Sequence, residues 1–108
     1  MKYMLDTDTA SYLIRGEAAL VSKAMSKLGS WCISSITASE LSVWLFGNIR
    51  PDLEERILQF LEGTDVIPFA SQDAMEFGRM RARMLPEQRA MQNMDGLIAA
   101  HAIARQLI

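Results

Sequence analysis

The chain has 108 residues, half of them apolar and 22% charged, which is the composition of one small globular domain spanning 1–108. No apolar run approaches the roughly 18 residues of a membrane span, and the start, whose short apolar stretch ends in acids, does not fit a signal peptide. A net charge of −2 excludes a chain coated with basic groups. The single cysteine, Cys32, excludes an internal disulfide and favours the cytoplasm.

Strand patterns and helix patterns alternate along the chain. Strands are predicted at 2–6, 31–36 and 65–69, and Pro68 places the third at a strand end or a sheet edge. The predicted helices cover 9–16, 17–28, 37–47, 52–63, 71–85 and 94–108. This alternation is typical of the α/β class, in which helices flank a mostly parallel sheet.

Carboxylates occur where such a sheet forms its functional sites. Asp6 and Asp8 come directly after the first strand. Glu40 lies in the first turn of the helix after the second strand, and Asp95 opens the last helix. Because sites in parallel sheets form at the carboxyl ends of the strands, we expect these acids at one edge of the sheet.

A purely structural role explains the same acids, since carboxylates cap free N–H groups at helix starts. Thr37-Ala-Ser-Glu40 has the pattern of a capping box, and Asp8 and Asp95 would serve as caps. Asp6 fits this role least well, because it continues directly from a buried strand. Acids crowded at one rim repel one another unless a cation neutralises them, and carboxylate oxygens suit Mg²⁺ or Mn²⁺.

Three stretches of the chain resemble the PIN-domain nucleases, and most closely the VapC-type toxins of bacterial toxin–antitoxin pairs. They are LDTDT at 5–9, SSITASEL at 34–41 and DGLIAAHA at 95–102, and they occur in the order of that family. The resemblance covers essentially the whole chain. It implies a PIN-like parallel sheet and a metal-dependent endoribonuclease whose partners are RNA, commonly tRNA, and an antitoxin protein. It also implies a homodimer or a higher oligomer.

The resemblance also implies roles for the acids. Asp6, Glu40 and Asp95 would hold Mg²⁺ or Mn²⁺, which lowers the pKa of a bound water and stabilises charge on the phosphate. Asp8 occupies a position where the family often has Asn, and we expect it, with Ser11, to support the metal ligands.

The chain departs from the family pattern in two places. It ends at Ile108, before the family's last strands and a further acidic segment, so we expect an incomplete sheet that is unstable, self-associating or weakly active. The connection EQRAMQNMD lacks the small-residue turn that often precedes the acid corresponding to Asp95. A truncated form that acts mainly by binding the antitoxin or itself is therefore the alternative function.

Two further surfaces are candidates for binding. Four arginines form the densest basic stretch, and they would bind RNA phosphates, face an antitoxin, or simply lie in water with Glu76 as a helical partner. They are Arg79, Arg81, Arg83 and Arg89. Because a helix cannot bury the consecutive apolar residues 43–46 on one face, Val43, Trp44 and Phe46 are candidates for a partner interface, with a fully buried helix as the alternative. We expect His101 to be a packed or surface residue rather than a metal ligand.

The DTDT stretch also matches the signature of haloacid dehalogenase-like phosphatases. In that reading Asp6 is the phosphorylated nucleophile and Asp8 the general acid. Those enzymes insert a loop and hairpin after the motif, whereas a helical pattern follows here, and they need a later lysine, whereas the last lysine of this chain is Lys27. This interpretation is therefore the weaker one.

Overall fold

Three short strands form a parallel sheet in the order β1-β2-β3. The computed structural model describes residues 2–16, 30–47, 50–84 and 93–107. The strands are β1 (Lys2–Leu5), β2 (Ser30–Ser34) and β3 (Asp65–Ile67). The predicted α/β class with a three-stranded parallel sheet is thus confirmed.

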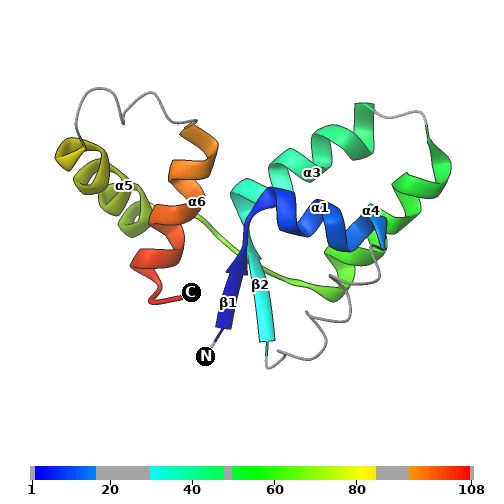
Figure 1. Cartoon of the computed structure of the whole chain (residues 1–108), viewed down its shortest axis with the longest axis horizontal. Coiled ribbons are helices and arrows are strands. Elements are labelled where there is room, and N and C mark those ends of the chain that lie inside the picture. Colours follow the sequence, from blue (N-terminus) through cyan, green and yellow to red (C-terminus); the bar gives the residue numbers. More distant parts are fainter. Residues whose placement is uncertain (1, 17–29, 48–49, 85–92, 108) are drawn as a thin grey trace.

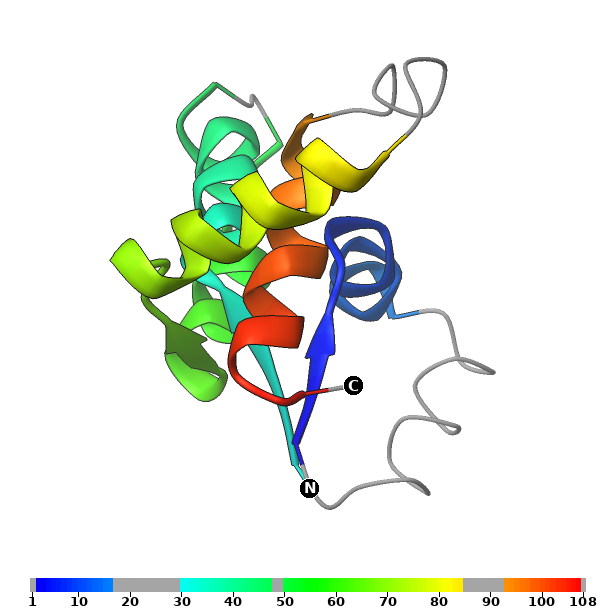
Figure 2. The same ribbon diagram turned by 90° about the vertical axis from the view of Figure 1, so that its left-hand side faces the viewer.

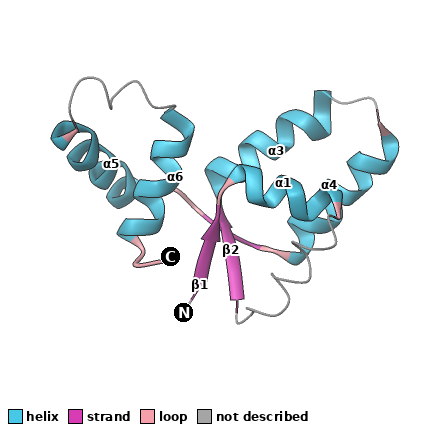
Figure 3. Cartoon of the chain, in the orientation of Figure 1, coloured by secondary structure: helices cyan, strands magenta, loops and turns pink. Residues whose placement is uncertain are grey.

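Helices cover both faces of this sheet, as Figures 1 and 3 show. One face carries α1 (Thr7–Arg15), α3 (Ser35–Gly47) and α4 (Pro51–Gly63). The other carries α5 (Ser71–Arg83) and α6 (Asn93–Ala104), which lie in front of the strands in Figure 2. The helix predicted at 17–28 lies outside the described residues. Within the described part of the chain, no helix is both long and apolar enough to cross a membrane.

The ends of the elements follow from local chemistry. β3 lies at the sheet edge and stops just before Pro68, as predicted, because proline has no N–H for the ladder. α1 ends at Gly16, whose φ of 73° is a left-handed conformation that glycine adopts without strain. α3 starts at Ser35, two residues before the expected Thr37. It starts early because the Ser34 hydroxyl accepts a hydrogen bond from the Ile36 N–H at 3.0 Å.

The α1–α3–α4 face of the sheet contains the larger apolar core. Leu5 from β1 and Ile33 from β2 pack there, and Trp31 stacks on Phe60 of α4 with ring centroids 5.7 Å apart. The buried members of this cluster are Ala10, Ile14, Ile33, Leu41, Leu45 and Ile57. Because side chains alternate along a strand, the neighbours of Leu5 and Ile33 face the opposite side.

The α5–α6 face has a smaller apolar cluster. Met4 and Cys32 contribute to it from the sheet and Ile98 from α6, with half-buried Ile36, Ile67, Ala102 and Leu107 around them. Cys32 is buried, in agreement with the expectation of a core residue. This packing places the first turn of α6, which carries Asp95, beside the carboxyl end of β1.

Candidate active site

Asp6 follows the last residue of β1 and is the N-cap of α1. Its carboxylate accepts a hydrogen bond from the Thr9 N–H at 2.8 Å. The expectation that Asp6 fits a capping role least well is therefore wrong, because the helix begins at Thr7, immediately after the strand. The bond uses Oδ1, and no described residue bonds to Oδ2, so capping and ligand binding are compatible.

Glu40 is held by a threonine next to Asp6. The Thr7 hydroxyl donates a hydrogen bond to Glu40 Oε1 at 2.5 Å, and the Thr37 hydroxyl lies 3.4 Å from the Thr7 oxygen. The predicted capping box between Thr37 and Glu40 is wrong, because α3 starts before Thr37 and leaves Glu40 in its second turn. Thr7 and Thr37 are buried, and sequence reasoning missed their role although both belong to the stretches that carry the resemblance.

A cleft of about 310 Å³ brings three of the four predicted acids together. Asp6 and Asp8 reach it from the start of α1, and Asp95 reaches it from the first turn of α6. The remaining lining residues are small or apolar, namely Met4, Ile98, Ala99 and Ala102. Glu40 is not among the lining residues and is linked to the cleft through Thr7. The convergence of acids expected at the strand ends is thus present, with Glu40 behind the other three.

The chemistry of the cleft suits a hard divalent cation. Within the described residues, none of Asp6, Asp8, Glu40 and Asp95 forms an ion pair, so the side chains of that part of the chain leave their charge uncompensated. The described residues also contain no group of three or more acids, histidines or cysteines arranged to hold a metal ion. Mg²⁺ commonly binds through one or two carboxylates and keeps several waters, so a preformed three-carboxylate group is not required.

Ser11 does not lie beside the four acids, where we expected it to support the metal ligands. It is buried on α1, lines a separate groove of about 470 Å³, and makes no described hydrogen bond to any of the four acids. Ser11 lies one helical turn beyond Asp8, which moves it towards α3 and α4. The groove is lined by Ser11, Ile14, Arg15, Val43, Trp44, Gly47 and Leu53.

The outer side of α3 is apolar and exposed beside that groove. Val43 and Phe46 are 69% and 85% exposed, and Trp44 is also exposed, whereas Leu45 is buried. The alternative prediction, a fully buried helix, is therefore wrong for residues 43–46.

The arginines of α5 lie apart from the acid cleft. Arg79 forms an ion pair with Glu76 at 3.1 Å, the helical pair that the solvated-face interpretation requires. Arg81 lies over the Phe77 ring at 5.7 Å, and Arg83 is exposed. Arg89 lies outside the described residues. RNA binding by this stretch stays a prediction.

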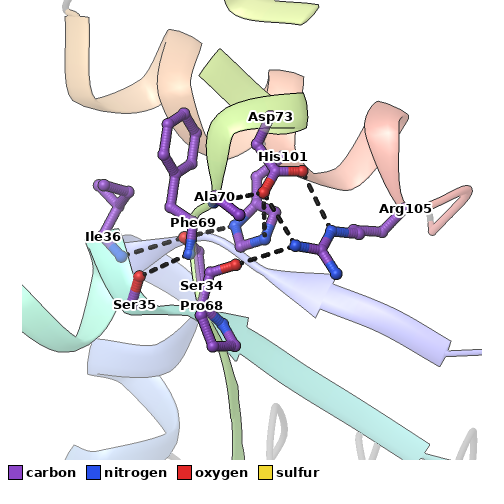
Figure 4. Close-up of polar contacts among 9 residues, drawn as sticks. All are labelled: Ser34, Ser35, Ile36, Pro68, Phe69, Ala70, Asp73, His101 and Arg105. Carbon is purple, nitrogen blue, oxygen red and sulfur yellow. Dashed lines mark hydrogen bonds and ion pairs between the residues drawn. The ribbon is translucent and has the colours of Figure 1, made fainter. Parts of the chain in front are cut away.

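A buried polar network between α5, α6 and the end of β2 was not predicted from the sequence (Figure 4). Asp73 and His101, both 0% exposed, belong to it with Ser34 and Arg105. The hydrogen bonds from Arg105 hold the pKa of the Asp73 carboxyl below its ordinary value. Burial lowers the pKa of His101, so the imidazole is neutral at pH 7. His101 is thus a packed residue, as expected, but one with specific partners.

Comparison with known proteins decides the family. A family model for the PIN domain matches residues 3–108. The chain belongs to the PIN-domain family. This membership rules out the haloacid dehalogenase interpretation and confirms the resemblance seen in the sequence.

The relatives within this family are VapC proteins. The chain is similar to the tRNA(fMet)-specific endonuclease VapC of Shigella flexneri, with 33% identity over 113 residues that cover 100% of this chain and 83% of the relative. It is 32% identical to ribonuclease VapC2 of Haemophilus influenzae, with the same coverage. The chain is therefore a PIN-domain protein of the VapC type.

Solved structures of VapC complexes share its fold. VapBC2 from Rickettsia felis, bound to a DNA fragment from its promoter, superposes with a TM-score of 0.84 at 27% identity, covering 99% of this chain and 84% of that one. VapBC-1 from nontypeable Haemophilus influenzae gives a TM-score of 0.82 at 27% identity, covering 99% and 83%.

Proposed function

We propose that this VapC-type protein is an endoribonuclease toxin of a type II toxin–antitoxin pair, and that it cleaves RNA with Mg²⁺ or Mn²⁺ held at the acid cleft. The observation that carries the proposal is the meeting of Asp6, Asp8 and Asp95 at one cleft, in a chain similar over its whole length to VapC ribonucleases. Because two relatives are named as tRNA(fMet)-specific endonucleases, tRNA is the substrate to test first.

The side chains of the cleft have distinct tasks in this proposal. Asp6 and Asp95 would hold the cation, and Glu40 would complete the site directly or through water. The Thr7 hydroxyl fixes the Glu40 carboxylate, and the Thr9 N–H fixes that of Asp6. A bound divalent cation supplies a water of lowered pKa and stabilises charge on the phosphate. Asp8 supports the ligands or orients the attacking water.

We also propose an antitoxin partner and a cytoplasmic site of action. The neighbouring structures are VapBC complexes, and the groove beside α3 is the apolar surface that the chain offers to such a partner. Val43, Trp44 and Phe46 lie on the exposed apolar side of α3, where burial against a partner is favourable. A second copy of the chain, which would form the homodimer that the family resemblance implies, is the alternative partner for these exposed side chains.

The test is cleavage of tRNA in Mg²⁺ or Mn²⁺, with Asp6→Asn and Asp95→Asn as variants. Asparagine caps a helix as well as aspartate does, so Asp6→Asn removes the charge while keeping the bond to Thr9. We expect each variant to lose more than about a hundredfold in rate, beyond the cost of an outer-shell change. The chelator EDTA should abolish cleavage by the unmodified chain.

Asp52→Asn is the matched control, since Asp52 is an exposed acid of α4 that pairs with Arg50. It should cleave like the unmodified chain. Cleavage that survives EDTA or Asp6→Asn would contradict the metal site. A folded chain that binds an antitoxin but cleaves no RNA would instead support the binding-only alternative.

A further inference from the structure

The buried network on the α5–α6 side is built around the Asp73 carboxylate. Its oxygens accept hydrogen bonds from the Ala70 N–H at 2.6 Å, from Arg105 Nε at 3.1 Å and from Arg105 Nη2 at 3.0 Å. Arg105 Nη2 also donates to the Pro68 carbonyl at 3.1 Å. The C-terminal end of α6 is thereby tied to α5 and to the segment that follows β3.

His101 ties the same helix to β2. Its Nδ1 lies 2.7 Å from Ser34 Oγ, and that oxygen already accepts a hydrogen bond from the Ile36 N–H. The other ring nitrogen, Nε2, lies 3.5 Å from Asp73 Oδ2. Phe69 holds the ring from the side, edge to face at 5.3 Å.

These contacts fix a helix that also carries an acid of the cleft. Asp95 lies six residues before His101 on α6, about 9 Å along a rigid helix. Ser34 is the last residue of β2, directly before the helix that carries Glu40. The network therefore connects the helix of Asp95 with the strand end from which Glu40 follows. Near Asp95, Gly96 allows close approach of α5, since a Cβ there would lie 3.2 Å from Phe77 Cε1.

Because the network is polar, it can fix the orientation of α6 on the sheet. Apolar contacts stabilise but are not directional, so they leave a helix free to roll and slide over a small cluster such as Met4, Cys32 and Ile98. Hydrogen bonds with a guanidinium fork have a fixed geometry. A buried ion pair adds little stability over an apolar replacement. Its more useful effect is to favour one orientation of the packed elements over others.

We propose that Asp73, His101 and Arg105 are positioning residues, which set the roll of α6 so that Asp95 faces Asp6 across the cleft. The inference rests on the proposed function, because it assigns the network to the same cation site. Loss of the Arg105 fork should weaken cation binding at the cleft, although Arg105 lies ten residues after Asp95, directly past the end of α6.

The experiment measures Mn²⁺ binding by electron paramagnetic resonance of the free ion, with no RNA present. We compare the unmodified chain with Arg105→Met, which keeps the apolar stem, and with Asp73→Asn, which keeps the shape of the carboxylate. Arg105→Met should weaken Mn²⁺ binding roughly tenfold, the range known for groups behind a metal ligand. Arg105→Lys should recover part of this loss, because lysine restores the charge but not the fork.

Arg50→Met is the matched control, because it breaks the exposed ion pair between Arg50 and Asp52 on α4. It should bind Mn²⁺ like the unmodified chain. Thermal unfolding identifies the temperature at which every variant is folded, and Asp73→Asn decides the question if Arg105→Met does not fold. Unchanged Mn²⁺ affinity in the folded variants would overturn the proposal.

A second readout separates this inference from the proposed function. If the unmodified chain binds no Mn²⁺, the metal site fails, and the amide NMR signals of Asp95 and Gly96 then decide the positioning role. Shifts of these signals in Arg105→Met, across about 15 Å of helix, support the role. Shifts confined to the residues around position 105 would overturn it.

Discussion

The two sides of the sheet are built from different chemistry. Under α1, α3 and α4, the buried cluster contains Ile33, Leu41 and Ile57 at 0% exposure, and the buried polar residues of α1 and α3 are the uncharged Thr7, Ser11 and Thr37. Under α5 and α6, a small apolar cluster is joined by the buried Asp73 and His101 and by the Arg105 fork. The comparison indicates that one side supplies most of the stability, whereas the other fixes the helix that carries Asp95.

The largest expected effect comes from the same substitution on each side. Ile33→Ala leaves a cavity in the larger cluster and should cost about 4 kcal/mol of the free energy of unfolding. Ile98→Ala, in the smaller cluster beside the cleft, should cost about 2 kcal/mol, because its surroundings can relax into the space. Denaturation by urea measures both values. Equal losses of free energy of unfolding in the two variants would show that the two clusters contribute alike to stability, which would contradict the comparison.

An intermediate effect is expected from pH, and it acts on the α5–α6 side. The pKa of His101 is lowered by burial from its ordinary value of 6.5, so below that pH the unfolded chain binds a proton that the folded chain refuses. The free energy of unfolding should therefore fall as pH drops below about 6.5, by at most about 1.4 kcal/mol per pH unit for one group. Because His101 is the sole histidine, His101→Gln should remove this slope.

The measurement is urea denaturation at several pH values between 7.5 and 5. If the free energy of unfolding still falls with pH in His101→Gln, another group titrates in this range. The loss of stability in acid would then not come from the buried network. At lower pH the Asp73 carboxyl adds an effect of the same sign, because its pKa is held below 3.8 in the folded chain and stability is lost as it becomes protonated.

The smallest effect concerns the outer side of α5, which belongs to neither cluster. A Cβ at Gly78 meets no atom within 4 Å, so Gly78→Ala should stabilise the chain by about 0.5–1 kcal/mol through helix propensity and a more restricted unfolded state. Gly96→Ala makes the same change where Phe77 lies 3.2 Å away, and the gain should be smaller or reversed. Thermal unfolding compares the two. Equal gains would show that the α5–α6 contact near Asp95 is loose.

Much of the site was visible in the sequence because it depends on position along the chain. Asp6 directly follows a short apolar strand, and Asp95 opens an apolar helical pattern, so a parallel sheet brings them to one edge. Val43, Trp44 and Phe46 were candidates for exposure because one helix face cannot bury four consecutive apolar residues, and all three are exposed in the structure.

Other features depend on side chains far apart in the sequence. Glu40 looked like the acid of a capping box, but it is bonded by Thr7, 33 residues earlier. Ser11 looked close to the acids, but one turn of helix places it in the other groove. Local patterns describe neighbours along the chain, and these partners were selected by packing.

The sequence by itself determined the alternation of strands and helices, the family, and the acids that follow the strands, because each is written in local spacing and residue type. Only the tertiary structure decided that His101 contacts Ser34, 67 residues away, and that Arg105 donates hydrogen bonds to Asp73. An isolated histidine on an apolar helix has many possible partners. The choice among them is made when α6 packs on the sheet, because that packing brings His101 Nδ1 within 2.7 Å of Ser34 Oγ.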